Sequence, residues 1–152
     1  MTSLSKRDWV LLLLRQSPLD RIRLMKALFL IWHRSGRRIN GFYNFVPYMY
    51  GPCSFELYQE LEELQRQHLI SQAPHRVPRW ASYCLTPSGQ SEAELVEQRV
   101  DNEVLSVVAT VAREVSNLNF AELLQKVYTE APEFTSQSVV SGLSNTDFGT
   151  SR

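Results

Sequence analysis

Two cysteines and three histidines are the residues that could bind a metal or act as nucleophiles, and their spacing predicts neither chemistry. Zinc ligands normally come in short pairs such as Cys-x-x-Cys or His-x-x-x-His, which place two ligands on one turn or helix face. No such pair occurs among the five residues, which are His33, Cys53, His68, His75 and Cys84. A nucleophilic cysteine also needs a base, and the sequence nominates none for Cys53. We therefore expect no metal site and no catalytic residue.

Carboxylates are the remaining candidates for acid–base chemistry. Glu60, Glu62 and Glu63 lie close together opposite a stripe of leucines, a pattern typical of a solvated helix face. The chain also lacks the G-x-G-x-x-G and P-loop motifs that bind phosphates and the G-x-S-x-G motif of serine hydrolases. The sequence thus predicts a non-enzymatic protein without a cofactor.

Basic side chains indicate binding instead. Residues 1–40 contain nine basic and two acidic side chains, a net charge of +7, although the whole chain has 16 of each and no net charge. A bipolar surface of this kind fits a charged partner on one side. The same pattern also arises when charged helix faces pack against one another, so both interpretations stay open here.

Arginine and tryptophan, which are enriched at interface hot spots, mark the candidate partner-binding positions. They are Arg34, Arg37 and Arg38 near the end of an early helix, and Arg76, Arg79 and Trp80 in a later loop. The alternative for the loop is that it is solvated, with Trp80 folded onto the core.

Five or six helices and a small hairpin must position these residues. Caps predict the helix starts, and they are Ser5, Ser17, Ser54, Thr86 and Asn119. Residues 101–116 are rich in valine, but apolar spacing of three and four predicts a helix there. This helix packs either into the core or against a second copy in a dimer.

Residues 69–86 are predicted to form two paired strands. Residues 37–53 are expected to be mostly irregular, and their aromatic side chains form either a lid on the core or a binding surface.

This order predicts a mostly α (α+β) protein: a winged-helix-like helical domain with a small two-stranded β-hairpin and additional C-terminal helices. We expect one domain over residues 1–140 and a disordered polar tail over 141–152, where Ser, Gly, Thr and Asn predominate. The longest apolar runs are far shorter than the roughly 20 residues of a membrane span, so no membrane partner is expected. Two cysteines are too few for a disulfide scaffold and favour the cytoplasm.

Residues 45–70 carry the most specific pattern, Phe-x-Pro-Tyr-x-Tyr-Gly-Pro-x-Ser followed by regularly spaced leucines. Its most distinctive members are Tyr48, Tyr50, Gly51, Pro52, Ser54 and Tyr58. This pattern resembles the Panacea (SocA-like) antitoxin domain and its YwgA-type relatives, and the resemblance extends over roughly residues 8–140. It implies a small bacterial or phage-borne regulatory protein, often antitoxin-like, whose partner is another protein such as a toxin. The same six residues also make sense as a structural entry to the third helix.

DNA binding by a winged helix is the alternative function. Its third helix would enter the major groove, but here that helix carries Glu56 and three further glutamates against Arg66. The basic N-terminal segment and the loop with Arg76 and Arg79 would then have to contact the phosphates and the minor groove. We therefore rank a protein partner above DNA.

Overall fold

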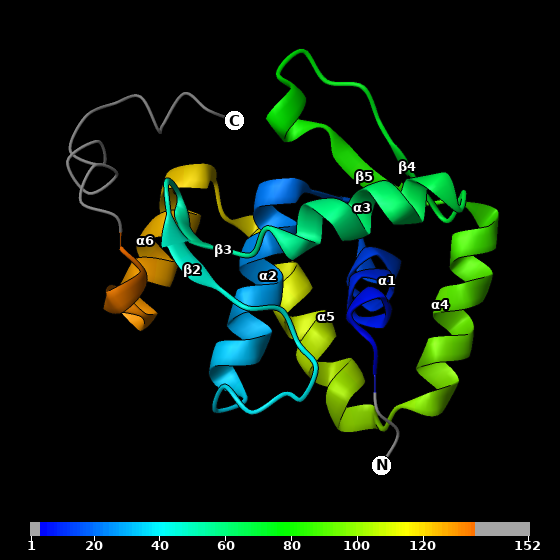
Figure 1. Cartoon of the computed structure of the whole chain (residues 1–152), viewed down its shortest axis with the longest axis horizontal. Coiled ribbons are helices and arrows are strands. Elements are labelled where there is room, and N and C mark those ends of the chain that lie inside the picture. Colours follow the sequence, from blue (N-terminus) through cyan, green and yellow to red (C-terminus); the bar gives the residue numbers. More distant parts are fainter. Residues whose placement is uncertain (1–3, 136–152) are drawn as a thin grey trace.

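The computed structural model of the protein describes residues 4–135 of the 152. The described part forms six α-helices, two small β-sheets and two 3₁₀ turns (Figure 1). The expected polar tail over 141–152 lies outside the described residues.

Helix α1 (Lys6–Gln16) lies at the centre of the helical body. Its run Trp9–Leu14 is buried throughout, and a helix that is apolar on all sides must be covered on all sides. The covering helices are α2 (Arg21–Arg34), α4 (Pro87–Arg99) and α5 (Asn102–Asn117), while α6 (Phe120–Glu130) packs against α2. On α5, Val108, Val111 and Val115 are buried, so this face of the helix contributes to the core.

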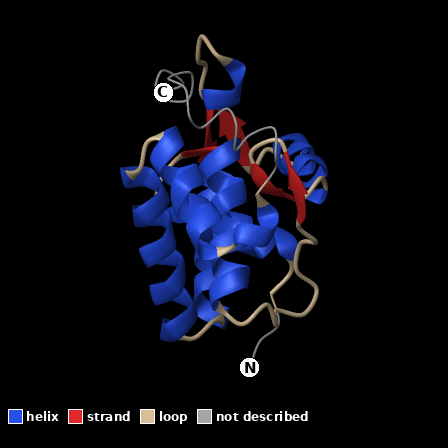
Figure 2. Ribbon diagram, turned by 90° about the vertical axis from the view of Figure 1, so that its left-hand side faces the viewer, coloured by secondary structure: helices blue, strands red, loops and turns tan. Residues whose placement is uncertain are grey.

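The winged-helix-like order is present: α1, strand β1 (Leu19–Asp20), α2, α3 (Glu56–Arg66), then strands β4 (Ile70–Gln72) and β5 (Ser82–Leu85). The predicted β4–β5 hairpin is confirmed, with Ser71 opposite Cys84. Strand β1, which was not predicted, extends this hairpin, because Leu19 pairs with Tyr83 and makes a three-stranded sheet of order β1-β5-β4. The helices form one body with the strands along one margin (Figure 2).

Three predicted helix starts are confirmed. Ser5 with Asp8 and Asn119 with Glu122 form reciprocal capping boxes, which satisfy amides that a helix start leaves without partners. The Thr86 side chain caps α4, whose first residue is a proline.

The predicted cap Ser17 of α2 is wrong. Asp20 caps this helix instead, because its carboxylate accepts a hydrogen bond from the Arg23 amide at 2.9 Å. Residues 19–20 are extended because they pair with β5, so α2 begins later than the Ser-Pro signal indicates.

The segment 37–53 is mostly irregular, as expected, but its end contains two short strands that were not predicted. Strands β2 (Val46–Tyr48) and β3 (Gly51–Cys53) form a separate antiparallel hairpin. Its central pair is Pro47 opposite Pro52, and proline weakens a strand signal because it cannot donate a ladder hydrogen bond. The aromatic residues of the segment divide between the two expected roles: Phe42 and Tyr43 are buried, whereas Tyr48 is exposed.

Candidate binding site

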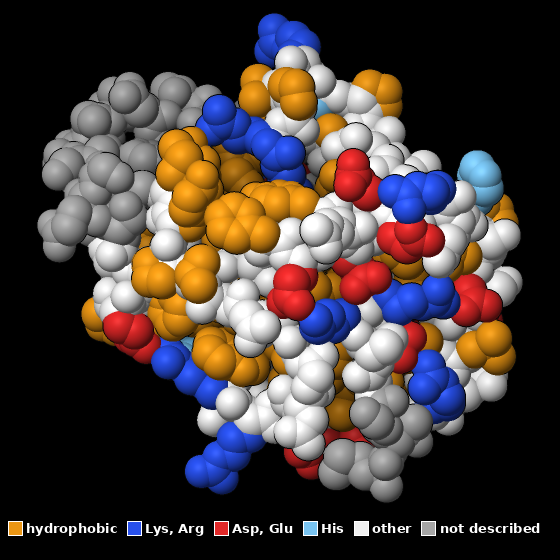
Figure 3. All heavy atoms as spheres, in the orientation of Figure 1, with side chains coloured by type: hydrophobic (Ala, Val, Ile, Leu, Met, Phe, Trp, Pro, Cys, Tyr) orange, Lys and Arg blue, Asp and Glu red, His pale blue; other side chains and the backbone are white. Residues whose placement is uncertain are grey.

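A cavity of about 290 Å³ lies between the first half of α2, the β2–β3 hairpin, the start of α3 and the 3₁₀ turn η1 (Pro78–Trp80). Figure 3 shows this face, on which hydrophobic side chains gather around a hollow bordered by Lys or Arg side chains. The lining residues are Arg21, Ile22, Met25, Lys26, Tyr48, Met49, Tyr50, Gly51, Cys53, Tyr58 and Arg79.

Three of the lining residues are cations and none is Asp or Glu. The Arg21 guanidinium lies 5.9 Å from the centroid of the Tyr58 ring. Arg79 lies 5.8 Å from the Tyr50 centroid and donates a hydrogen bond to the Tyr50 hydroxyl at 3.1 Å. Both arginines are therefore held by aromatic rings, and neither forms an ion pair with a described residue.

The third cation, Lys26, is only 3% exposed. Its ammonium donates one hydrogen bond, to the Pro52 carbonyl at 3.3 Å. Burial lowers the pKa of Lys26 to about 8, so the side chain is still mostly protonated at neutral pH. The wall of the cavity thus contains a buried positive charge.

Exposed apolar side chains surround the cavity mouth. We call Tyr48, Met49, Phe55 and Tyr58 the aromatic rim; Tyr48 and Phe55 are 47% and 51% exposed. Tyr48 packs edge-on against Phe55 with 5.1 Å between ring centroids, and Phe55 lies 6.2 Å from Tyr58. Clustered exposed aromatic rings of this kind mark interaction surfaces more often than isolated ones do.

The Tyr-Gly-Pro turn places the rim over the cavity. Gly51 has φ +89°, a conformation that favours glycine. A Cβ at this position would also lie 3.0 Å from the Tyr128 ring. Glycine therefore allows the hairpin to turn tightly against α6.

Ser54 does not cap α3, so this predicted cap is wrong. The helix begins at Glu56, and its N-cap residue is Phe55, whose side chain makes no capping hydrogen bond. Ser54 is buried, and its hydroxyl donates to the Glu56 carboxylate at 3.3 Å while its amide contacts the Met25 sulfur at 3.2 Å. The motif serine thus joins the hairpin to α2.

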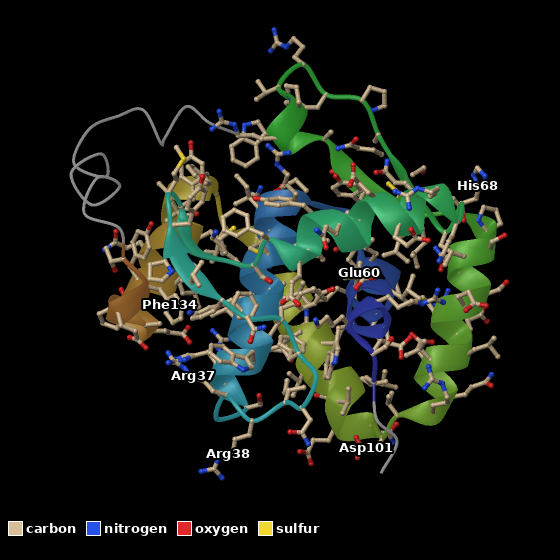
Figure 4. The ribbon with its side chains drawn as sticks, in the orientation of Figure 1. Arg37, Arg38, Glu60, His68, Asp101 and Phe134 are labelled. Atoms are coloured by element: carbon tan, nitrogen blue, oxygen red, sulfur yellow. The ribbon has the colours of Figure 1, made fainter. Side chains whose placement is uncertain are left out.

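The predicted basic group at the end of α2 is largely neutralised. Arg34 forms ion pairs with Glu114 of α5 at 2.7 Å and Glu130 of α6 at 2.6 Å. Arg37 pairs with Glu133 and lies 5.4 Å from the Phe134 centroid. Figure 4 shows Arg37 turned towards Phe134, whereas Arg38 points away from the body. Arg34 thus links α2 to α5 and α6, and Arg37 links the end of α2 to the 3₁₀ turn Pro132–Phe134. All three arginines are exposed, and Arg38 is the one without an ion pair to a described residue.

The three predicted loop residues separate in space. Arg76 is exposed near the tip of the β4–β5 loop, and Arg79 lines the cavity. Trp80 is only 7% exposed and packs edge-on against Phe120 with 5.2 Å between centroids. Trp80 is therefore folded onto the core, as in the alternative interpretation, and cannot offer its ring to a partner on this surface.

The charge asymmetry along the chain does not persist on the surface. Six of the nine basic residues in 1–40 form ion pairs, and these are Lys6, Arg7, Arg15, Arg23, Arg34 and Arg37. Two of the four α3 glutamates are likewise paired, Glu56 with Lys6 and Glu63 with Arg66. Neither a strongly basic N-terminal face nor a fully acidic third helix is therefore formed.

Sequence reasoning missed Arg21 and Lys26 as site residues. Lys26 had a visible signal, since it is the single charge inside the apolar run from Leu24 to Trp32. Arg21 had none, because its place in the cavity depends on a hairpin that begins 25 residues later in the chain.

A comparison of the chain with protein-family models, curated proteins and solved structures found no match. The resemblance to the Panacea antitoxin domain therefore stays a prediction. Within residues 4–135, no group of three or more His, Cys, Asp or Glu side chains could hold a metal ion. No described helix is both long enough and apolar enough to span a bilayer.

Proposed function

We propose that the protein is a non-enzymatic, antitoxin-like regulatory protein that acts by binding an acidic segment of a partner protein at the cavity and the aromatic rim. The observation that carries this proposal is the combination of exposed aromatic side chains with a cavity whose described lining contains three cations and no carboxylate. Aromatic and arginine side chains contribute most of the energy at protein interfaces.

Charge complementarity selects the chemistry of the partner. Arg21 and Arg79 border the cavity and are not paired with a described carboxylate, so an Asp or Glu of the partner gains attraction there without displacing an internal one. The rings of Tyr48 and Phe55 need a partly apolar segment to cover them. An acidic segment with at least one apolar anchor residue satisfies both requirements.

The DNA-binding alternative has less support. It relied on a basic N-terminal face, and two of the three arginines that define that face, Arg34 and Arg37, are engaged in ion pairs. On the exposed side of α3, Glu62 still presents a carboxylate.

Co-expression with the product of each neighbouring gene tests the proposal. We expect one of them to form a stoichiometric complex, measured by size-exclusion chromatography with light scattering and by calorimetry. Because salt screens the ion pairs at the cavity, the complex should weaken as the salt concentration rises.

Two double variants separate the aromatic rim from the rest of the surface. Tyr48→Ser with Phe55→Ser should lower the affinity at least tenfold. Leu95→Ser with Val107→Ser is the matched control, because these apolar residues are as exposed but lie on α4 and α5. Equal losses in the two double variants, or specific DNA binding with no protein complex, would contradict the proposal.

A further inference from the structure

The strongest unexplained feature of the molecule is the buried ammonium of Lys26. It has three donor hydrogens and one acceptor, the Pro52 carbonyl at 3.3 Å. Pro47 and Pro52 form a pair of the β2–β3 ladder that exchanges no hydrogen bonds, so the Pro52 carbonyl points away from β2 and is free to accept from the lysine. A neutral donor would satisfy that carbonyl equally well, so the hydrogen bond does not explain why a charge is placed there.

Within residues 4–135, no carboxylate forms an ion pair with this ammonium. The Asp20 carboxylate acts on Lys26 only at longer range and raises its pKa, and it already accepts hydrogen bonds from the Arg23 amide at 2.9 Å and the Arg23 guanidinium at 2.7 Å. Cys53 stands next to the lysine, but burial raises the pKa of its thiol, which keeps it neutral at pH 7. Burying an unpaired charge is costly. An uncharged residue at position 26 would avoid this cost.

Two further cations turn this isolated charge into a site. Arg21 and Arg79 line the same cavity as Lys26, and like charges in one small space repel unless an anion lies between them. We propose that this cavity is a binding site for an oxyanion, a carboxylate or phosphate, carried on a small flat apolar group. This inference goes beyond the proposed function and does not depend on the existence of a protein partner.

The remaining lining residues define the body of the ligand. Tyr48 and Tyr58 contribute aromatic side chains, and Met25 and Met49 contribute adaptable apolar ones. A volume of about 290 Å³ is at the small end of the range for ligand pockets. The cavity therefore fits one aromatic ring with its anionic substituent rather than a dinucleotide.

The probes are phenyl phosphate, benzoate and inorganic phosphate. Their binding to the purified protein is measured by calorimetry and by NMR chemical shifts. We expect phenyl phosphate and benzoate to bind with Kd below about 1 mM and inorganic phosphate to bind at least tenfold more weakly, because it lacks the ring. Lys26→Met should weaken phenyl phosphate binding at least tenfold. Arg76→Gln, which removes an exposed arginine outside the cavity lining, should leave it unchanged.

A second variant keeps the test decisive if Lys26→Met does not fold. Arg21→Gln with Arg79→Gln changes side chains at the border of the cavity and should also lower the affinity at least tenfold. Absence of phenyl phosphate binding to the folded protein at 10 mM, or equal affinity in the cavity variants and Arg76→Gln, would overturn the proposal.

Raising the pH gives an independent readout. The groups that share the cavity with Lys26 or act on its charge are Asp20, Arg21, Tyr48, Tyr50, Cys53, Tyr58 and Arg79. Benzoate keeps its charge between pH 7 and 9.5, whereas Lys26 loses its proton, so benzoate affinity should fall several-fold over that range. The fall should persist in Cys53→Ser, which excludes a cysteine thiolate as its cause. A constant benzoate affinity would contradict the role of Lys26.

A mixture with the co-expressed partner distinguishes the source of the anion. If the anion comes from the acidic segment of the partner, phenyl phosphate should compete with the complex. If it is a free small molecule, phenyl phosphate should bind the complex and the isolated protein equally. Both outcomes support the anion site, but the second contradicts the proposed binding of the partner at the cavity. Failure to find a partner leaves the probe measurements unaffected.

Discussion

A lysine in a protein core loses hydration that a single carbonyl cannot replace. Lys26 illustrates this cost directly, because burial lowers its pKa from 10.5 to about 8. Each unit of such a shift corresponds to about 1.4 kcal/mol between the charged and neutral forms. The lysine therefore destabilises the fold at neutral pH, which is the expected trade-off for a residue kept for binding.

The pH dependence of stability should report this cost. The pKa of Lys26 is lower in the folded protein than in the unfolded chain, so between about pH 8 and 10.5 the unfolded chain holds more protons. Stability due to this residue then rises with pH. Relative to Lys26→Met, the wild type should gain about 2 kcal/mol in free energy of unfolding between pH 7 and 9.5.

Urea denaturation of both proteins at the two pH values measures this difference. Comparing the two proteins removes most of the contribution of Cys53, since burial raises its pKa in both and its effect has the opposite sign. An unchanged stability difference between pH 7 and 9.5 would show that Lys26 keeps an ordinary pKa.

The junction of β5 and α4 shows how one element fixes the position of another. The Thr86 hydroxyl accepts the Gly89 amide at 3.0 Å and donates to the His68 carbonyl at 2.7 Å. A Cβ on Gly89 would lie 2.0 Å from the Leu69 carbonyl oxygen, an overlap that only backbone movement can relieve. The Leu-Thr-x-x-Gly motif thus joins the end of α3 to the start of α4.

Gly89→Ala should therefore destabilise the protein despite the higher helix propensity of alanine. We expect a loss of roughly 2 kcal/mol or more, by analogy with overpacked cores, and a fall in Tm of several degrees. Thermal unfolding followed by circular dichroism measures it. Ser91→Ala, at an exposed position of the same helix, is the control and should change Tm by less than about 2 °C.

Charge is distributed differently over the whole molecule than along the chain. Arg34 connects α2 to both α5 and α6 through Glu114 and Glu130, so residues distant in sequence cancel one another. Six described cations have no described carboxylate partner, and three of them line the cavity: Arg21, Lys26 and Arg79. The electrostatic field is thus local and suits a small anionic group better than a nucleic-acid backbone.

Weak DNA binding follows from this distribution. In gel-shift experiments with its own upstream DNA at about 150 mM salt, we expect no specific complex. At lower salt, the slope of log affinity against log salt should be shallower than about −3, because only three described cations outside the cavity lack a carboxylate partner, namely Arg38, Arg76 and Arg113. A specific complex with a steeper slope would favour the winged-helix regulator instead.

The sequence alone determined the helices, the β4–β5 hairpin and the mostly helical fold class, because caps and apolar spacing act within a few residues. The tertiary structure alone decided that Pro47 and Pro52 face each other in a second hairpin, and that Trp80 is buried while Lys26 lines a cavity. It also decided which charges remain free, since most ion pairs of the N-terminal segment join residues 50 or more positions apart. Such pairs depend on packing between elements, and no local pattern encodes that packing.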